Sequence, residues 1–420
     1  SVVIIGAGVF GLSTALAIAK RHPSTKVTVV DRLTPPVEDA TSVDTTRCIR
    51  SDYTDSLYAR LAAQAQKLIE ADPDLQPYYF KQGMTYAAKR DYDRSVIVEM
   101  PSREAVFRSI HGPDAEPRPL SDLGDKSSWN TAYCNLGAAF VDAREFIRAY
   151  YQRASAVPQI SFRVGTPVDS LQIVDGRCTG VAMQNGTTIA ADQVIVAAGA
   201  WSGKLVDLGQ RQTPIGHEVV WFKVTPEEEA RWGKMSITTN ESTGLNIFPP
   251  YKGEIKVLRR SPGYRNTITL SYPENPSRKV DISYPRTTVD HPTDVIPADA
   301  EEAVRRDLRE MMPPLADRPF DRTKICWYHD CRISTTPTAD LLIAPHPHIP
   351  GIHLATGGSA HAWKFLPILG DCVVDSMQGT LSQELVEKWA FDKFSGGKDE
   401  AAPRMDGRPE ELRDVVRTRL

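Results

Sequence analysis

The residues best suited to binding a nucleotide lie at the start of the chain. Gly6, Gly8 and Gly11 stand in the turn Gly6-Ala7-Gly8-Val9-Phe10-Gly11, between a short β-branched run and a segment with helical spacing. Gly6 allows a tight turn, Gly8 lets a pyrophosphate approach the backbone, and Gly11 lets helix and strand pack closely. A second β-branched run ends at Asp31, whose carboxylate can accept hydrogen bonds from an adenosine ribose. The sequence therefore predicts a βαβ unit with a dinucleotide site, without separating NAD from FAD.

Basic side chains are the next candidates for chemistry. Arg47 and Arg50 lie three residues apart, so they share one helical face or line one turn. Taken alone, they are typical of a solvated pair in surface salt bridges. Because they directly follow the dinucleotide unit, they are also candidates for the site. Lys256 alternates with apolar residues, a pattern that by itself is typical of a solvated lysine on an edge strand.

Length and composition limit the class of protein. The 420 residues exceed what one hydrophobic core usually holds, so two lobes are expected. With 41% hydrophobic and 25% charged residues and no long apolar run, the chain has the composition of a soluble globular protein, and no membrane span is predicted. The net charge of -3, with acids and bases interspersed, gives no electrostatic reason to expect nucleic acid binding. We therefore expect a small-molecule ligand.

Cysteine spacing points to a reducing, intracellular compartment. No C-x-x-C pair or framework spacing suggests zinc or a disulfide scaffold, and the histidines are not spaced as a metal site. No secretion signal is visible before the first strand, and Thr418-Arg419-Leu420 only loosely resembles a peroxisomal address. We expect a cytoplasmic or peroxisomal protein without a metal. The cysteines are Cys48, Cys134, Cys178, Cys326, Cys331 and Cys372.

Hydrophobic periodicity places the remaining elements. The prolines of 33–40 predict a loop, and 192–202 reads as a buried parallel strand that ends in a small-residue turn. A strand is expected over 80–88 and an antiparallel meander over 160–188, with a hairpin turn at Asn185-Gly186. The alternating, aromatic stretch 212–325 is the expected substrate lobe, and 91–135 and 393–420 carry no recognised element. Helices are predicted over 58–70, 142–153, 298–312 and 365–377.

Three motifs together carry a resemblance to a known family. They are the glycine turn, the segment 197–201 and the block Gly357-Gly358-Ser359-Ala360-His361-Ala362-Trp363-Lys364-Phe365-Leu366-Pro367. The chain resembles FAD-dependent amine oxidases of the sarcosine oxidase family. It is most similar to the fungal branch, which includes fructosyl amino acid oxidases (amadoriases) and saccharopine and pipecolate oxidases.

The resemblance implies an α/β, two-lobed fold like that of D-amino-acid oxidase. One domain would be a Rossmann-like FAD-binding unit, and the other a mainly antiparallel β-sheet that binds substrate. We expect the FAD-binding domain to comprise 1–82, 140–211 and 322–420, and the substrate domain 83–139 and 212–321. A monomer is expected.

The same resemblance assigns roles to individual residues. Cys326, before Trp327-Tyr328, would tether FAD through a thioether, with Cys331 as the competing site and a buried structural cysteine as the alternative. Arg50 and Lys364 would hold the substrate carboxylate, because a planar fork and a point charge orient it without reacting. Lys256 would promote the reaction with oxygen, because a fixed cation stabilises superoxide.

The closing motif also departs from the family. Ala360 and Ala362 replace the usual glycines and Trp363 replaces a phenylalanine, which narrows the space beside the flavin. His361 is expected to have a structural or flavin-contacting role. Tyr53 and Trp363 are expected to contact substrate, together with Arg50 and Lys364. The residues expected to bind FAD are Gly6, Gly8, Val9, Phe10, Gly11, Asp31, Arg32, Ser42, Thr46, Arg47, Val168, Ala198, Gly199, Trp201, Cys326, Gly358, Ser359, Ala360, His361 and Lys364.

The expected activity is oxidation of a secondary amine or N-substituted amino acid. Hydride would pass from the α-carbon to N5 of FAD, giving an imine, and oxygen would be reduced to hydrogen peroxide. Two alternatives share the glycine turn: an NAD-dependent dehydrogenase, and a flavin-binding protein without oxidase activity. The partners would be an amino acid-type small molecule and oxygen.

Overall fold

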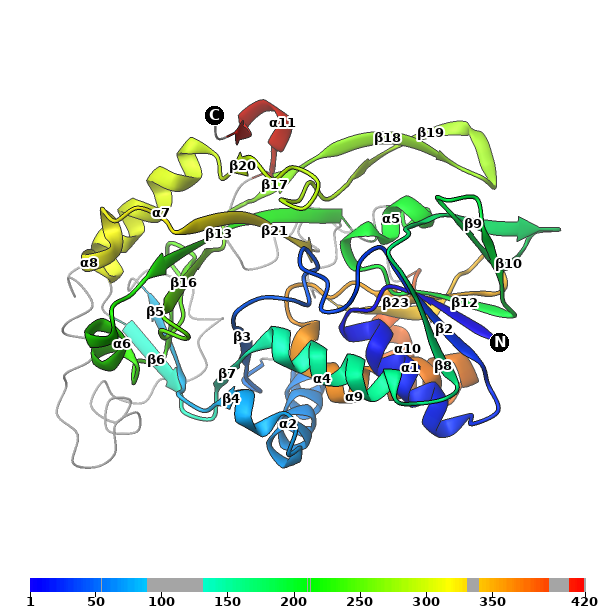
Figure 1. Ribbon diagram of the computed structural model, residues 1–420, viewed down its shortest axis with the longest axis horizontal. Helices are drawn as coiled ribbons and strands as arrows, with labels where there is room; N and C mark the ends of the chain where they lie inside the picture. Colours follow the sequence, from blue (N-terminus) through cyan, green and yellow to red (C-terminus); the bar gives the residue numbers. More distant parts are fainter. Residues whose placement is uncertain are drawn as a thin grey trace.

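The computed structural model describes residues 1–53, 55–88, 131–209, 211, 213–330, 340–392 and 408–418. Two large sheets lie side by side, each with helices packed on it (Figure 1). This is the α/β, two-lobed architecture that the sequence predicts. No helix in these ranges combines the length and apolar character needed to cross a membrane.

The first sheet contains six strands and includes the predicted βαβ unit. All neighbouring pairs are parallel except β22 and β23. The strands, in spatial order, are β22 (Leu342–Pro345), β23 (Ile352–Thr356), β12 (Gln193–Val196), β1 (Val2–Ile5), β2 (Val27–Asp31) and β8 (Ile160–Val164).

Strand alternation places the first sheet between two apolar layers. Val2 and Ile4 of β1 pack into the helix-side core, whereas Val3 and Ile5 pack against a small antiparallel sheet on the other face. The helices are α1 (Val9–Arg21), α2 (Ser56–Ala71), α4 (Ala143–Ser155), α9 (Leu366–Gln378) and α10 (Gln383–Trp389). The small sheet contains β9 (Val168–Val174), β10 (Arg177–Met183) and β11 (Thr188–Ala190).

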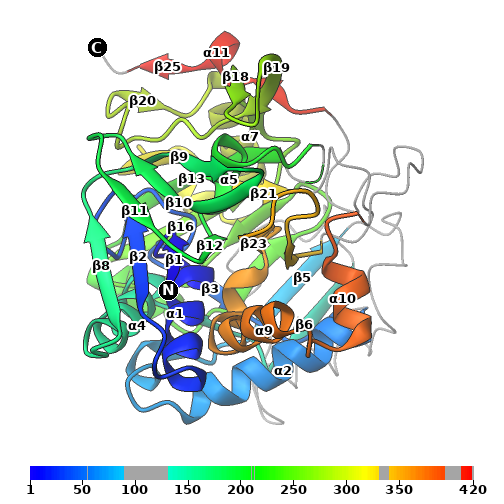
Figure 2. The same cartoon turned by 90° about the vertical axis from the view of Figure 1, so that its right-hand side faces the viewer.

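Contact between α1 and α9 joins the two ends of the chain. The Ser13 hydroxyl donates to Leu366 O at 2.7 Å and accepts from the Gly370 N–H at 2.8 Å. A Cβ on Gly370 would lie 2.0 Å from Ser13 O, so only glycine permits this approach. The close crossing of the two helices is visible in Figure 2.

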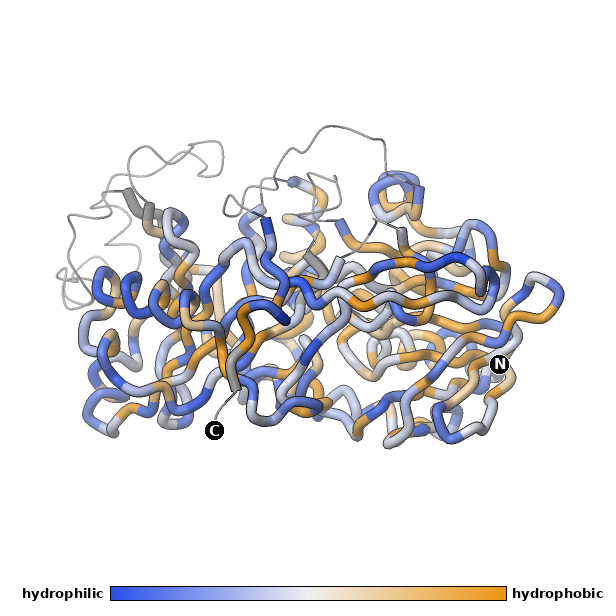
Figure 3. The backbone as a smooth tube through the Cα atoms, turned by 90° about the horizontal axis from the view of Figure 1, so that it is seen from above, coloured by the Kyte–Doolittle hydropathy of each residue, from blue (hydrophilic) through white to orange (hydrophobic). Residues whose placement is uncertain are grey.

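The second sheet contains nine strands and is antiparallel except for the β14–β5 and β17–β24 pairs. Its order is β24 (Glu410–Glu411), β17 (Tyr264–Arg265), β13 (Thr213–Lys223), β16 (Glu254–Arg259), β15 (Leu245–Ile247), β14 (Ile237–Asn240), β5 (Met84–Ala88) and β6 (Thr131–Asn135), with β21 (Arg322–Asp330) also paired to β13. Its apolar core includes residues of α6 (Pro226–Trp232), α7 (Ala298–Met311) and α8 (Pro313–Ala316). Apolar stretches, orange in Figure 3, run along strands whose outer turns are mostly hydrophilic.

Shorter elements complete the fold. The 3₁₀ helices are η1 (Gln76–Tyr78), η3 (Gly199–Trp201) and η4 (Ala362–Phe365), and the short α-helices are α5 (Ser202–Leu205) and α11 (Leu412–Val415). The remaining strands are β3 (Arg47–Ile49), β4 (Tyr79–Phe80) and β7 (Ala139–Val141) in one sheet, β18 (Thr267–Tyr272) with β19 (Asn275–Ser283), and β20 (Asp294–Val295) with β25 (Arg417–Thr418).

Three sequence expectations need correction. Strand 160–164 is not part of an antiparallel meander, because it pairs in parallel with β2 at the edge of the first sheet. The single strand expected over 80–88 is two strands in different sheets, since the chain turns at Gly83, whose φ is +76°. The strand that carries Lys256 is not an edge strand, because β16 pairs with both β13 and β15.

The expected domain boundaries remain a proposal. β21 lies within 322–420, the range assigned to the FAD-binding domain, yet it pairs with β13 of the second sheet. The expectations for 91–130 and 393–407 lie outside the described residues.

Candidate active site

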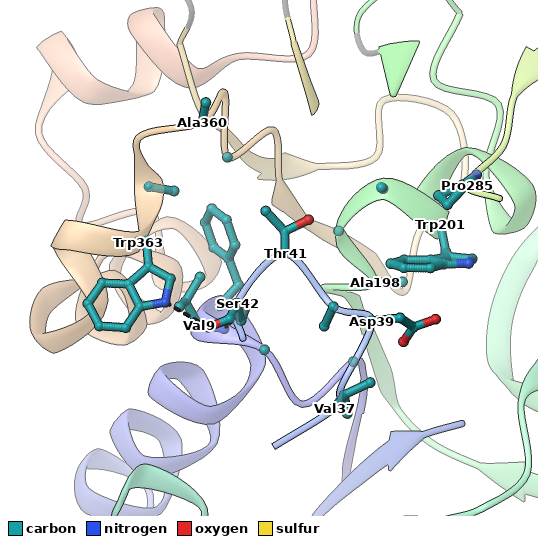
Figure 4. A pocket seen from close by; sticks show the side chains of 18 of the residues that line it. Val9, Val37, Asp39, Thr41, Ser42, Ala198, Trp201, Pro285, Ala360 and Trp363 are labelled. Atoms are coloured by element: carbon teal, nitrogen blue, oxygen red, sulfur yellow. Dashed lines mark hydrogen bonds between the residues drawn. The ribbon is translucent and has the colours of Figure 1, made fainter. Parts of the chain in front are cut away.

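A cavity of about 730 Å³ lies between the two sheets, which is in the size range of cofactor and ligand sites. Its wall contains residues of the glycine turn, the loop after β2, η3, β16 and the closing motif (Figure 4). The expected site residues that line it are Gly6, Gly8, Val9, Phe10, Asp31, Arg32, Ser42, Arg47, Arg50, Val168, Ala198, Gly199, Trp201, Lys256, Gly358, Ala360, His361, Trp363 and Lys364. Gly11, Thr46, Tyr53, Cys326 and Ser359 are not in the cavity wall itself.

The glycine turn has the close contacts that its spacing predicts. Gly6 has a φ of +108°, and a Cβ there would lie 2.4 Å from Ala197 O. A Cβ on Gly11 would lie 1.8 Å from Gly6 O, so helix and strand could not pack as they do. A Cβ on Gly8 would lie 2.7 Å from the Ser42 hydroxyl, which accepts the Val9 N–H at 3.1 Å. The turn therefore leaves its backbone close to the cavity.

Asp31 lines the cavity and also braces the turn. Its carboxylate accepts the Ala7 N–H at 2.7 Å and the Leu33 N–H at 3.3 Å. Burial raises the pKa of this carboxyl, and the backbone donors oppose that shift. Asp31 therefore uses part of its hydrogen-bonding capacity to accept these backbone N–H groups.

A loop of the second lobe reaches this end of the cavity. Arg32 forms ion pairs with Asp39 and, at 3.0 Å, with Asp290, and the Thr287 hydroxyl donates to Asp39 at 2.8 Å. Figure 4 shows Asp39 and Trp201 on the same side of the cavity as Pro285. Sequence reasoning missed Asp39 and Asp290, because nothing in the local sequence predicts that the two loops meet.

A buried ion cluster stands where the second sheet faces the cavity. Lys256 is 2% exposed, and its ammonium lies 3.1 Å from Asp44 and 4.0 Å from the centre of the Phe248 ring. Asp44 also pairs with Arg47. Burial lowers the pKa of Lys256 to about 8, although Asp44 opposes the shift. For Asp44, burial would raise the pKa, but Lys256 and Arg47 outweigh it and hold the pKa well below its usual range.

Asp44 is the principal residue that sequence reasoning missed. It lies in the segment already singled out, three residues before Arg47, but an acid beside a base is also common on any surface. Only the tertiary fold, which places Lys256 from 212 positions away beside Asp44, distinguishes a buried site residue from an ordinary surface acid.

Cys326 is buried on the same face of the second sheet. Antiparallel pairing sets it opposite His217 of β13, whose side chain lines the cavity. Its Sγ lies 3.8 Å from Nη2 of Arg47, another cavity residue. Thus Cys326 stands immediately behind the cavity wall, next to a fixed cation. Cys331 lies outside the described residues.

At the other end of the cavity, Arg50, Tyr53, His361 and Lys364 lie together. Lys364 Nζ donates to Tyr53 Oη at 2.7 Å, and Oη lies 3.0 Å from His361 Nδ1. The Arg50 guanidinium stacks on the Tyr53 ring at 4.9 Å and is also paired with Asp52 at 3.1 Å. The fold therefore joins residues more than 300 positions apart into one cationic group around a phenol.

Two residues of the closing motif that differ from the family pattern, Ala360 and Trp363, have clear structural consequences. Ala360 has a φ of +57°, a left-handed conformation that favours glycine, so alanine there carries backbone strain. Trp363 donates its indole N–H to Ser42 O at 2.9 Å and packs on Phe146 at 5.4 Å between ring centres (Figure 4). The indole is thus anchored to the loop that caps the glycine turn.

Comparison with known proteins decides the family. The model of the FAD dependent oxidoreductase family, DAO, matches residues 1–376. The chain belongs to this family of flavoenzymes. This finding confirms FAD as the cofactor class and gives the alternative of an NAD-dependent dehydrogenase no support.

Relatives place this FAD-dependent oxidoreductase more narrowly. It is 27% identical to L-saccharopine oxidase of Schizosaccharomyces pombe, with 93% of each chain covered. It is 23% identical to monomeric sarcosine oxidase of a Bacillus species, over 88% of this chain and 90% of the relative. Its structure is similar to fructosamine oxidase (amadoriase II) of Aspergillus fumigatus, with a TM-score of 0.84, 29% identity and coverage of 100% and 97%. The resemblance to the sarcosine oxidase family is confirmed.

The residues of this flavoenzyme fit an extended dinucleotide. The Gly6 and Gly8 backbone lines the cavity, and a Cβ at these positions would collide with Ala197 O and with the Ser42 hydroxyl. From there the cavity continues past Arg47 and Lys256 to the Arg50 and Lys364 pair. Diphosphate at the helix N-terminus and a ring near the second sheet match this arrangement of donors and cations.

We predict that Asp44→Asn lowers the free energy of unfolding by about 3–5 kcal/mol, because it removes the carboxylate that pairs with the buried Lys256 ammonium and with Arg47. The folded-state pKa of Asp44 is depressed, so its stabilising effect is present above pH ~4 and is lost as the pH falls. Urea denaturation at several pH values measures this difference, which should shrink in acid.

The matched control is Asp281→Asn, on an exposed strand, which should change stability by less than about 1 kcal/mol. Equal, small effects of both substitutions at neutral pH would contradict the role of the buried cluster.

Proposed function

We propose that this chain is a flavin-dependent oxidase of a secondary amine or N-substituted amino acid. The observation that carries the proposal is the pairing of Arg50 and Lys364 around Tyr53, at the end of the cavity away from the glycine turn. The names of the relatives, which are oxidases of amines and amino acids, support the same class.

The first lobe would hold the cofactor by its phosphates and adenosine. The Gly6–Gly11 turn, with the N-terminus of α1 behind it, supplies backbone N–H groups and a positive dipole end. Asp31 and Arg32 would contact the adenosine side, where they line the cavity.

The substrate carboxylate would bind between Arg50 and Lys364. Arg50 offers a planar fork that is held by its stacking on Tyr53, and Lys364 offers a point charge from the closing motif. These two cations would orient the α-carbon by holding the carboxylate, without taking part in bond making or breaking.

When bound, FAD accepts a hydride from the substrate α-carbon at N5 and returns two electrons to oxygen, so that an imine and hydrogen peroxide are formed. The residues around the substrate favour a neutral amine, since Arg50 and Lys364 repel a proton on its nitrogen. Burial of the site limits water, and imine hydrolysis would follow release.

Lys256 would serve the oxygen half of the reaction. It is a buried cation on the second sheet, fixed by Asp44 and the Thr46 carbonyl. A fixed positive charge in a low-dielectric site stabilises the superoxide anion that one-electron transfer produces. Its alternative, a solvated surface lysine, does not agree with a side chain that is 2% exposed.

Cys326 would form the covalent link to the cofactor. A thiolate is the nucleophile that would attack the 8α carbon of the isoalloxazine. The methyl group would lose a proton, the ring system would take up two electrons, and oxygen, the acceptor of the proposed reaction, would remove them. The Arg47 guanidinium, 3.8 Å from the sulfur, would stabilise negative charge there during the attack. The position next to the cavity wall and the Arg47 guanidinium supports this role over that of a purely structural buried cysteine.

The activity is tested by oxygen consumption over a panel of N-substituted amino acids, with peroxide measured in parallel. We expect turnover of at least one member and bleaching of the flavin by the same compound without oxygen. A flavin that no member reduces would contradict the oxidase and leave a binding protein.

For the covalent link, Cys326→Ser should release the flavin into the supernatant after acid precipitation, whereas the wild-type colour stays in the pellet. Cys372→Ser, a substitution on α9 outside the cavity wall, is the matched control and should retain the link. Acid-soluble flavin in the wild type would overturn the assignment.

For Lys256→Met, anaerobic reduction of the flavin by substrate should be unchanged, while reoxidation by oxygen slows by about 100-fold or more. Because the pKa of Lys256 is lowered to about 8, its charge is present below that pH and lost above it. The wild-type reoxidation rate should therefore fall as the pH rises through about 8.

Stopped-flow mixing of reduced enzyme with oxygen measures this rate. Lys223→Met, at an exposed position 76% accessible to solvent, is the control. Unchanged oxygen reactivity in Lys256→Met would remove the proposed role.

A further inference from the structure

The carboxylates on the cavity wall lie at one of its ends, where Arg32 also lies. Among the described residues, the carboxylates that line the cavity are Asp31, Asp39 and Asp290, all at the glycine-turn end. The end that contains Arg50 and Lys364 also contains Arg260, and no described carboxylate lines the wall there. Asp52 and Glu241, which pair with Arg50 and Arg260 from outside the wall, offset part of this positive charge, but the wall itself presents only the cations to a ligand.

Arg260 is placed by the strand that carries Lys256. Residues 256, 258 and 260 alternate onto the cavity side of β16, and all of them line the cavity. The extended backbone continues to Arg260, whose N–H donates to Gly244 O at 2.9 Å. Four residues of strand separate the backbone of Arg260 from that of Lys256 by about 13 Å.

Arg260 also lies close to the carboxylate-binding group. Burial raises the pKa of Tyr86, and the charges of Arg50 and Arg260 both oppose that shift, so both lie within electrostatic range of one phenol. The Arg50 guanidinium is 5.9 Å from the centre of the Tyr86 ring. The two arginines thus face the same part of the cavity, Arg50 from just after β3 and Arg260 from just after β16.

The ion pair of Arg260 leaves its charge available to a ligand. Glu241, its acidic partner among the described residues, is 3.5 Å away, longer than a close N–H···O bond. Glu241 does not line the cavity, whereas Arg260 does. The wall therefore presents a guanidinium, with 22% of its side chain exposed, and not the carboxylate behind it.

We propose that Arg260 binds a second carboxylate of the substrate, at the end away from the one held by Arg50 and Lys364. This inference rests on the proposed oxidase and narrows its substrate to an amine with two separated acidic groups. A cationic distal group would meet repulsion from Arg260, and a neutral one would leave a partly buried guanidinium without an anion in the cavity.

The test uses pairs of N-alkylated amino acids that differ only at the far end of the alkyl group. One member ends in a carboxylate and the other in the isosteric carboxamide, over a series of chain lengths. In the wild type, kcat/KM for the best carboxylate should exceed that for its amide by about 10- to 100-fold, the size of a charge-assisted pair.

Arg260→Met should abolish this preference by lowering kcat/KM far more for the carboxylate than for the amide, and Arg260→Lys should restore part of the preference. Glu241→Gln separates substrate recognition by Arg260 from a structural role of its ion pair, because this variant removes the internal carboxylate and keeps the guanidinium. If Arg260 recognises substrate, this variant keeps or increases the preference. Equal losses for both substrates in Arg260→Met, or no preference in the wild type, would overturn the proposal.

Binding without turnover distinguishes this inference from the oxidase itself. Adipate and its monoamide, which cannot be oxidised as amines, are titrated while the flavin absorption is followed. A preference for adipate that depends on Arg260 supports the anionic subsite even if no amine reduces the flavin, in which case only the oxidase fails. Equal affinities in wild type and Arg260→Met would contradict the subsite.

Discussion

The cavity depends on the ion pairs of Asp44, whose carboxylate is buried between the two sheets. It comes from the loop after β2, yet one of its cations, Lys256, belongs to the second sheet. The same loop donates from Thr41 to the Trp327 carbonyl and accepts the Trp221 indole N–H at Thr45, at 3.0 Å. These bonds hold the loop after β2 against the second sheet, so they help to set where its residues meet the cavity wall.

Much of the fold could be predicted because its signals are local. The glycine turn, the buried β-branched strands and the cap at Asp142, which accepts the Glu145 N–H at 3.1 Å, are all determined by neighbouring residues. Strand partners are not local. The run 160–164 alternates as a half-exposed strand would, and it lies at the edge of a parallel sheet, so periodicity could not distinguish it from a meander strand.

The candidate site divides in the same way. Residues inside recognisable motifs, such as Arg50, Lys364 and Lys256, do line one cavity. Asp39, Asp44 and Arg260 were missed, because a charged residue in a loop or at a strand end is usually solvated. Their importance comes from partners distant in the sequence. Arg260 did have a weak signal, since it is four positions after Lys256 on the same strand face.

The two hydrogen bonds of the Ser13 hydroxyl, which join α1 to α9, have a consequence for folding during synthesis. Helix α1 packs against a helix whose first residue follows Ser13 by 353 positions, so the nucleotide-binding turn lacks this supporting neighbour until residues 366–378 have been synthesised. Until then the face of α1 that α9 covers is exposed. The turn therefore gains its full support only after α9 has been made.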